Sequence, residues 1–333
     1  MQQREFGKGG RKVGAIGFGA MSFSGSYGAT TEQESVEALA ACLEVGSTHW
    51  DTSDVYGFGV SENVIGRFFR ENKGARSKVF LATKGGIKRR PGTVERVFDN
   101  SPEYLRSCLE GSLRRLGVDH VDLYYLHRRD PEARIEDIAG TMAKFVEEGK
   151  IGGYGLSEVA PFTLRQAHAV HPVRAVQSEY SIWSRMPELG MLQTCKELGV
   201  AFVAFSPLGR GVFAGGVTPH AEFGPLDFRR GSPRFVGDNL QRNLASIAPF
   251  LTFARERGMS GAQAALRWVL AQGEHIIPIP GTRYAPHVRD NAGAGSGPLS
   301  AAELAEIDRL LPMGFVHGAR YTLYQQIGAE LYG

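Results

Sequence analysis

The stretch His49-Trp50-Asp51-Thr52-Ser53-Asp54-Val55-Tyr56-Gly57 starts apolar, becomes polar and ends in glycine. This pattern predicts a short strand that runs into a loop carrying an acid, Asp51, and a phenol, Tyr56. Two later strand-like segments also end in a polar residue: Lys84 follows residues 79–83, and His127 follows residues 121–126. If these strands are parallel neighbours, the acid, the phenol, the amine and the imidazole meet at one edge of the sheet.

Strand-like and helix-like segments alternate on both sides of this stretch. Thr31 and Glu34 form a capping box for one helix, and Ser101 followed by Pro102 opens another. Eight such alternations predict a parallel sheet covered on both faces, either a closed barrel or an open doubly wound sheet. We expect strands near residues 14–18, 49–51, 79–83, 121–126, 151–157, 175–180, 200–205 and 276–280, and helices near 31–46, 61–69, 101–117, 135–149, 162–170, 188–199 and 262–271.

Three segments lie outside this alternation. Residues 4–13 contain Gly7, Gly9 and Gly10 and suggest a hairpin ahead of the first barrel strand. Residues 209–239 hold seven glycines and three prolines, and such a long insertion after the seventh strand predicts a functional loop. A last helix is expected over residues 299–311 with Ser300 as its N-cap, followed by a tail.

Composition excludes several classes of protein. The chain has 333 residues, a length that one α/β barrel can fill, so we expect a single domain over residues 1–333. Its 38 Lys and Arg against 35 Asp and Glu are dispersed, which argues against a nucleic-acid partner. The three cysteines are far apart, and His168 and His171 lack a third ligand, so no disulfide or metal site is expected. Without a signal peptide or membrane span, a cytoplasmic location is expected.

Four motifs, in this order, resemble those of the aldo-keto reductases, which are NADPH-dependent enzymes. They are Val13-Gly14-Ala15-Ile16-Gly17-Phe18-Gly19, Asp51-Thr52-Ser53-Asp54-Val55-Tyr56-Gly57, Ser206-Pro207-Leu208-Gly209 and Pro280-Gly281-Thr282-Arg283. The resemblance covers nearly the whole chain. It implies an α/β fold of the (β/α)8 TIM-barrel type, NADP(H) as cofactor, and the reversible reduction of small aldehydes or ketones to alcohols.

The same resemblance gives the four polar residues their catalytic roles. Carbonyl reduction needs a hydride on carbon and a proton on oxygen. Tyr56 is the expected proton donor, and Lys84 is the cation that assists it. Asp51 pairs with Lys84, and neutral His127 binds and orients the carbonyl oxygen. Taken singly, each residue has an ordinary structural alternative, such as a helix cap, a solvated charge or a packing residue.

A larger set is implied for the cofactor. Ser157, Glu158 and Gln177 correspond to contacts with the nicotinamide carboxamide, although the family usually has asparagine at the position of Glu158. Residues 17–22 fail as a dinucleotide fingerprint, because the third glycine is absent. The full expected set is Gly19, Met21, Asp51, Ser157, Glu158, Gln177, Phe205, Ser206, Leu208, Gly209, Gly211, Gly281, Thr282, Arg283, His287, Asp290 and Asn291.

Substrate contacts are expected from the loops after the strands. Phe23, Tyr27 and Trp183 are candidate walls, together with residues 228–235, and Arg128 or Arg129 is a candidate partner for an acidic substituent. Two alternatives remain open. One is a non-catalytic NADP-binding subunit like the β subunits of potassium channels. The other is a barrel lyase that uses Lys84 as a Schiff-base amine.

Overall fold

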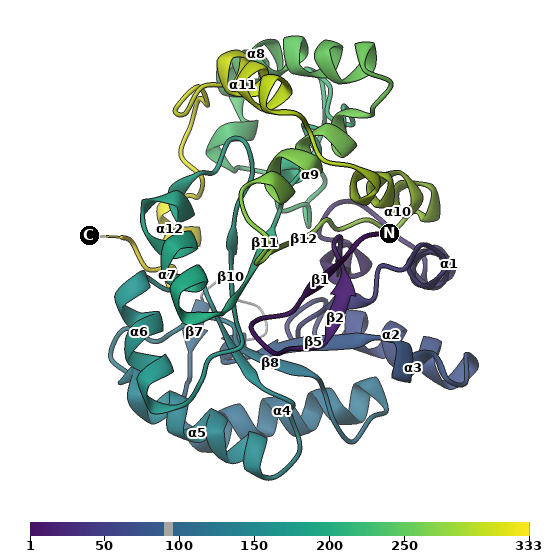
Figure 1. Cartoon of the computed structure of the whole chain (residues 1–333). Helices are drawn as coiled ribbons and strands as arrows, with labels where there is room; N and C mark the ends of the chain where they lie inside the picture. Colours follow the sequence, from purple (N-terminus) through teal and green to yellow (C-terminus); the bar gives the residue numbers. More distant parts are fainter. Residues whose placement is uncertain (90–95, 333) are drawn as a thin grey trace.

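The computed structural model describes residues 1–89 and 96–332 (Figure 1). Eight parallel strands form one sheet in the order β3-β4-β5-β8-β9-β10-β11-β12. Gly19 forms a parallel bridge with Gly281, and the amide of Gly17 donates to the carbonyl of Pro278 at 2.9 Å, so the last strand meets the first and the barrel closes. The strands are β3 (Phe18–Gly19), β4 (His49–Asp51), β5 (Phe80–Gly85), β8 (Leu123–Leu126), β9 (Tyr154–Ser157), β10 (Ala175–Glu179), β11 (Ala201–Phe205) and β12 (Ile276–Ile279).

Helices surround this barrel (Figure 1). The capping box of Thr31 and Glu34 is present, as predicted, and Ser101 accepts the amide hydrogen bond of Tyr104 with Pro102 in the first turn. The helices are α1 (Glu32–Val45), α2 (Val60–Glu71), α3 (Ala75–Lys78), α4 (Pro102–Leu116), α5 (Ile135–Glu147), α6 (Pro161–Val170), α7 (Met191–Leu198), α8 (Gly237–Glu256), α9 (Gly261–Ala271), α10 (Ala285–Ala292), α11 (Ala301–Leu310) and α12 (Leu323–Gln326). The prediction of a (β/α)8 barrel is confirmed.

The barrel interior is apolar and is covered at its N-terminal end by the predicted hairpin, β1 (Gln3–Glu5) and β2 (Lys12–Gly14). Phe6 follows β1 and stacks on Phe80 of β5 with ring centroids 4.3 Å apart. Alternate residues of the strands join it in one buried cluster, because side chains along a strand point in turn to opposite faces. The hairpin covers the N-terminal end of the barrel, so a functional site is expected at the other end, where the C-terminal ends of the strands lie.

Three segments differ from expectation. A second hairpin, β6 (Ile87–Arg89) and β7 (Arg96–Phe98), follows β5. The loop after β11 ends at residue 236, close to the predicted residue 239, but it is followed by a helix, α8, that the sequence did not predict. This helix begins with Gly237 and contains Pro249, and glycine and proline both disfavour helix. The C-terminal segment, residues 311–332, contains a short helix, α12, and packs against the barrel; we call it the C-terminal strap. Figure 1 shows it passing from α11 toward α6, where Glu330 accepts the amide hydrogen bond of Ala160.

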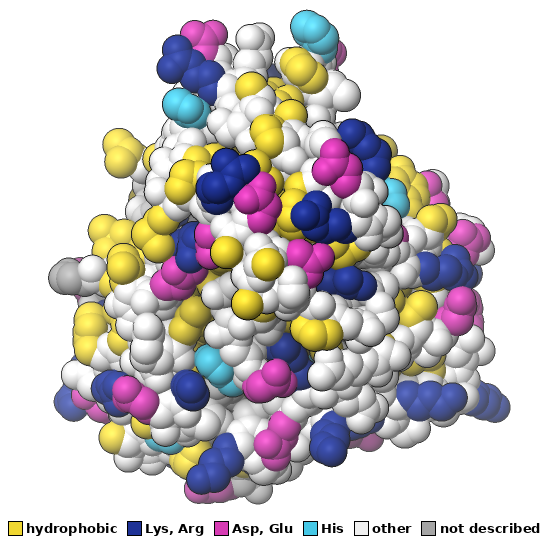
Figure 2. Space-filling view, turned by 45° about the horizontal axis from the view of Figure 1, so that its top comes forward, with side chains coloured by type: hydrophobic (Ala, Val, Ile, Leu, Met, Phe, Trp, Pro, Cys, Tyr) yellow, Lys and Arg dark blue, Asp and Glu magenta, His cyan; other side chains and the backbone are white. Residues whose placement is uncertain are grey.

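The surface agrees with the balanced composition. On the face drawn in Figure 2, Lys and Arg side chains alternate with Asp and Glu, and no single sign of charge dominates. Among the described residues, no helix combines the length and the apolar character needed to cross a lipid bilayer. No group of three or more His, Cys, Asp or Glu within residues 1–89 and 96–332 is arranged to hold a metal ion.

Candidate active site

The structure brings Asp51, Tyr56, Lys84 and His127 together at the C-terminal ends of β4, β5 and β8. The ammonium of Lys84 donates to a carboxylate oxygen of Asp51, to the backbone oxygen of Thr52 at 2.8 Å and to the hydroxyl of Tyr56 at 3.3 Å. The rings of Tyr56 and His127 lie edge to face, with centroids 5.9 Å apart. This grouping follows from the parallel register, which pairs Asp51 with Ala82 and Lys84 with Tyr125.

Lys84 is fully buried, and so is Asp51 beside it. Burial alone lowers the pKa of Lys84, but the Asp51 carboxylate and the Tyr56 hydroxyl raise it, and the net pKa lies above the ordinary value. The amine is therefore a fixed cation at neutral pH. The second oxygen of Asp51 accepts a hydrogen bond from Gln177 at 2.8 Å, so the carboxylate is held from two sides.

A cavity of about 940 Å³ opens above these residues. Asp51, Tyr56 and His127 line it, while Lys84 lies behind the wall. The expected cofactor residues that also line it are Gly19, Met21, Ser157, Gln177, Phe205, Ser206, Leu208, Gly211, Gly281, Thr282, Arg283, His287, Asp290 and Asn291. A volume of this size suits a dinucleotide together with a small substrate.

Glu158 and Gly209 are the two expected cofactor residues that do not line the cavity. The carboxylate of Glu158 accepts hydrogen bonds from both terminal nitrogens of Arg320, at 3.1 and 2.6 Å, and from the amide of Glu179 at 2.9 Å. The side chain of Glu158 is therefore directed away from the cavity and is an anchor for the C-terminal strap. Gly209 is buried.

The turn after β11 has an unusual backbone. Ser206, Gly209, Arg210 and Gly211 have φ values of +49°, +56°, +58° and +102°. Such left-handed positions are costly for Ser and Arg, and they recur where backbone amides converge on a ligand. Arg210 itself lines the cavity and forms a buried ion pair with Glu179 at 2.8 Å. Sequence reasoning missed Arg210, although its position between two glycines was a usable signal.

The turn between β12 and α10 also lines the cavity. Arg283 reaches across the barrel seam and donates to the backbone oxygen of Tyr27 at 2.8 Å. The hydroxyl of Thr282 lies 3.2 Å from Nδ1 of His287. Asp290 accepts hydrogen bonds from Ser260 at 2.7 Å and from Gln263, so its carboxylate ties α10 to the start of α9.

The candidate substrate residues divide into two groups. Tyr27 and Arg128 line the cavity, whereas Phe23 and Trp183 do not. Phe23 packs on Phe18 in the core at 5.5 Å, and Trp183 is buried against two phenylalanines, because large aromatic rings fill the space between barrel and loops. Neither Phe23 nor Trp183 therefore forms part of the cavity wall at which the substrate was expected.

The two adjacent arginines also have different partners. Arg129 forms an ion pair with Glu330 of the C-terminal strap at 2.5 Å and does not line the cavity. Arg128 donates to the hydroxyl of Ser157 at 2.9 Å and to the backbone oxygen of His127 at 2.6 Å. Within the expected segment 228–235, the cavity is lined by Phe228, Arg229, Arg230 and Gly231, whereas Phe235 packs in the core.

The C-terminal strap contributes cavity residues that sequence reasoning did not find. They are Tyr321, Thr322, Tyr324 and Gln325. No local pattern marks them, since their placement depends on ion pairs with residues far away in the chain.

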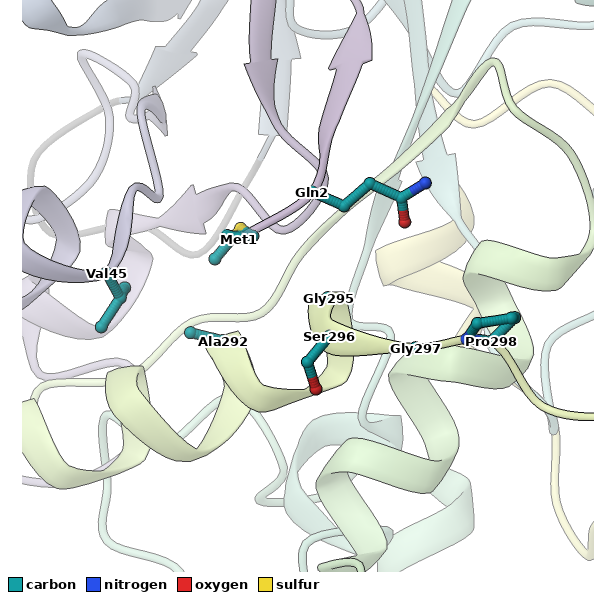
Figure 3. A pocket seen from close by; sticks show the side chains of 8 residues that line it. All are labelled: Met1, Gln2, Val45, Ala292, Gly295, Ser296, Gly297 and Pro298. Carbon is teal, nitrogen blue, oxygen red and sulfur yellow. The ribbon is translucent and has the colours of Figure 1, made fainter.

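A second hollow of about 670 Å³ lies beside the N-terminus and α10 (Figure 3). Its lining has no acidic or basic side chain.

Comparison with known proteins agrees with this geometry. The model of the aldo/keto reductase family matches residues 15–312. The aldo-keto reductase yakc of Schizosaccharomyces pombe, named as an NADP(+) enzyme, is 42% identical over 319 residues, covering 93% of this chain and 94% of its own. A probable aldo-keto reductase of Glycine max is 40% identical over 324 residues, covering 96% and 92%.

Solved structures show the same fold. Glycerol dehydrogenase from Gluconobacter oxydans superposes with a TM-score of 0.83 at 27% identity, covering 93% of this chain and 94% of that one. An aldo-keto reductase from Klebsiella pneumoniae in complex with NADPH has a TM-score of 0.73 at 27% identity, covering 97% and 100%. With a family match over nearly the whole chain, this protein belongs to the aldo/keto reductase family.

Proposed function

We propose that the chain, acting as one barrel domain over residues 1–333, reduces aldehydes or ketones with NADPH and uses Tyr56 as the proton donor. The observation that carries the proposal is the 3.3 Å contact between the Tyr56 hydroxyl and the buried ammonium of Lys84, beside His127 on the cavity wall. Microscopic reversibility extends the proposal to alcohol oxidation with NADP(+).

Hydrogen-bond donors and acceptors set the direction of proton transfer. An ammonium group has three N–H donors and no acceptor, and those of Lys84 go to Asp51, Thr52 and Tyr56. The oxygen of Tyr56 therefore accepts from Lys84, and its own proton must point elsewhere, toward the cavity. As the proton leaves, the Lys84 cation stabilises the phenolate, and a unit charge at about 4 Å is worth roughly 4 kcal/mol at a dielectric near 20.

The residues present fit NADP(H). Five buried guanidinium nitrogens among the described residues have no hydrogen-bond partner, and three of them belong to arginines that line the cavity: Nε of Arg128, Nη1 of Arg210 and Nε of Arg283. Buried donors of this kind are costly unless an anion satisfies them. We assign the 2′-phosphate to Thr282 and Arg283, the adenine to Asn291, and the pyrophosphate to the amides of the turn at residues 206–211. The nicotinamide, which supplies the hydride, is assigned to Phe205, Ser157 and Gln177.

The burial of Lys84 bears on the lyase alternative. A Schiff-base amine must reach its substrate as a neutral nucleophile. Lys84 meets neither requirement, because it lies outside the cavity lining, its pKa is raised, and its three donors are engaged. These observations disfavour the lyase. The alternative of a non-catalytic NADP-binding subunit is separated from a reductase by measuring turnover.

The test is Tyr56→Phe, assayed with a panel of aldehydes and ketones while NADPH oxidation is followed at fixed pH. We expect NADPH binding to stay within about twofold and turnover to fall by about 10³-fold or more, because the lost group acts only in the transition state. Tyr104→Phe is the matched control, since it removes a phenol hydroxyl that bonds to the backbone of Ile87 and lies off the cavity. Activity retained by Tyr56→Phe would refute the mechanism, and NADPH binding without turnover in the wild type would favour the non-catalytic subunit.

A further inference from the structure

The imidazole of His127 is supported from behind by Ser53. Nδ1 of His127 lies 3.0 Å from the hydroxyl oxygen of Ser53. Ser53 is fully buried, and it lies in the same loop as Asp51 and Tyr56. His127 follows β8, and its main-chain amide donates to Gly85 at 2.8 Å, so backbone and side chain are both held. This serine is a feature that the catalytic proposal above does not use.

The Ser53 hydroxyl has one proton and several neighbours that compete for it. The hydroxyl oxygen lies 3.1 Å from a carboxyl oxygen of Asp54 and 3.4 Å from the backbone oxygen of Lys84. It also accepts the amide hydrogen of Val55 at 3.4 Å. The nearest of the possible acceptors is Nδ1 of His127, at 3.0 Å. The acceptor that receives the Ser53 proton decides which ring nitrogen of neutral His127 is protonated.

Two arrangements of protons have opposite consequences. If Ser53 donates to Nδ1, neutral His127 carries its proton on Nε2 and can donate a hydrogen bond to a carbonyl oxygen. If Ser53 instead donates to Asp54, it accepts from Nδ1–H, and Nε2 of neutral His127 is then an acceptor. Only the first arrangement lets a neutral imidazole stabilise the developing negative charge on the substrate oxygen.

We propose that Ser53 is a positioning residue that donates its hydroxyl proton to Nδ1 of His127 and so keeps the His127 proton on Nε2. This inference rests on the proposed carbonyl reduction for its catalytic meaning, but the tautomer itself is a property of the resting protein. Asp54 opposes Ser53 by competing for the same proton. The titratable and polar groups near Asp54 include Glu62 of α2, Tyr104, Cys108 and Arg115 of α4, Tyr124 of β8, and Ser53 itself.

The direct test is the tautomer of His127 in the protein without substrate. Long-range ¹H–¹⁵N spectra of ¹⁵N-histidine-labelled protein distinguish the two neutral tautomers, and His127→Ala identifies the signal. We expect the Nε2–H form in the wild type at pH 8, a loss of that form in Ser53→Ala, and its recovery in Ser53→Thr. We expect Asp54→Asn to increase the Nε2–H form, because a neutral amide competes less for the hydroxyl proton. A wild-type spectrum of the Nδ1–H form would overturn the proposal without any variant.

The kinetic test is a double-mutant cycle between Ser53 and His127. We expect Ser53→Ala to lower kcat/KM by about tenfold with unchanged NADPH binding, the effect of losing one hydrogen bond. In the His127→Ala background the same change should have no further effect. Equal losses in both backgrounds would show that Ser53 acts independently of His127 and would overturn the inference.

A matched control is Ser61→Ala, which removes another buried hydroxyl, one bonded to Thr52 at 2.8 Å and to the backbone of Ala20 at 2.9 Å. We expect kcat/KM to change less than twofold. Failure of the two proposals can be told apart. Normal turnover that depends on Tyr56 but not on Ser53 would refute this inference alone. Absence of turnover would refute the proposed reductase, while the spectra would still decide the tautomer.

Discussion

At the scale of single residues, the candidate site is organised by one buried cation. Lys84 uses its three donors on an acid, a backbone carbonyl and a phenol, and this leaves it no rotational freedom. The phenol is therefore held at a fixed distance from the charge before any substrate arrives. Preorganisation of this kind is a large source of catalytic rate, because no group has to reorient as charge develops.

Cofactor choice is predicted to depend on Arg283. Arg283→Ala should weaken NADPH binding by about tenfold or more and leave NADH binding nearly unchanged, because only NADPH carries the 2′-phosphate. Fluorescence titration with each nucleotide measures this. Arg289→Ala is the control, since Arg289 lies on the next turn of the same segment but pairs with exposed Glu44 at 2.7 Å. Equal losses of affinity for NADPH and NADH would contradict the assignment of the 2′-phosphate to Arg283.

Asp54 is predicted to make stability depend on pH. Burial, with Glu62 nearby, raises the pKa of Asp54 to about 6. A raised pKa means that the folded state binds the proton more tightly than the unfolded state, so this contribution is full at low pH and is lost as the pH rises through about 6. Asp54→Asn should stabilise the protein by about 1–2 kcal/mol at pH 8, where the Asp54 carboxyl is ionised; partial exposure of the side chain keeps the gain at this size. At pH 5, where the carboxyl is protonated in the folded state, the gain should be smaller. Urea-unfolding midpoints at both pH values check this, and an equal gain at both would contradict it.

At the scale of elements, the C-terminal strap turns an open barrel end into a walled cavity. Arg320 anchors one end of the strap on Glu158, and Glu330 anchors the other. Glu330 also accepts from the amide of Ala160 at 2.7 Å and the hydroxyl of Thr163 at 2.6 Å, at the start of α6. The segment between the anchors presents Tyr321 and Tyr324 to the cavity.

Releasing one anchor should loosen this strap. Glu330→Ala removes the ion pair with Arg129 and leaves two buried donors without an acceptor, so we expect faster proteolysis within the strap. We also expect a rise of about threefold or more in the KM of carbonyl substrates, with less effect on NADPH binding. Glu306→Ala, which breaks an exposed ion pair with Arg309 on α11, is the control. Unchanged proteolysis and KM would mean that the strap holds without this anchor.

At the scale of the whole molecule, the barrel is closed at its base by the N-terminal hairpin. Arg4 is buried, and its guanidinium donates to three backbone oxygens, those of Leu270, Gly273 and Ile276, at 2.8, 2.6 and 2.6 Å. These carbonyls lie where α9 ends and β12 begins. The hairpin thus links the first residues of the chain to its last barrel strand.

Arg4→Met is predicted to destabilise the whole fold. Three carbonyls would lose a charged donor inside the protein, and we expect a loss of about 2–4 kcal/mol in the free energy of unfolding. Lys12→Met, an exposed position on the neighbouring strand, should change it by less than about 0.5 kcal/mol. Urea unfolding followed by circular dichroism measures both. A loss in Arg4→Met no larger than in the control would show that the hairpin is not part of the cooperative core.

Local patterns predicted much of this molecule. Capping residues such as Thr31 and Ser101 act within one turn of a helix, so their effect can be read from neighbouring letters. The meeting of Asp51, Lys84 and His127 was also predictable, because parallel neighbouring strands end at one rim. Helix α8 was missed, since Gly237 and Pro249 are usually breaking signals and packing of its apolar face against the fold outweighs them.

The sequence by itself determined the alternation of strands and helices, the end of the barrel at which the candidate site lies, and the residue types gathered there. The tertiary structure alone decided which side chains remain available to ligands. Arg129 and Glu158 are taken by the C-terminal strap, through contacts such as Glu158 with Arg320 across 162 positions. Likewise, Ser53 meets His127 across 74 positions. Such contacts depend on the summed geometry of many elements, and periodicity and capping rules extend only over a few residues.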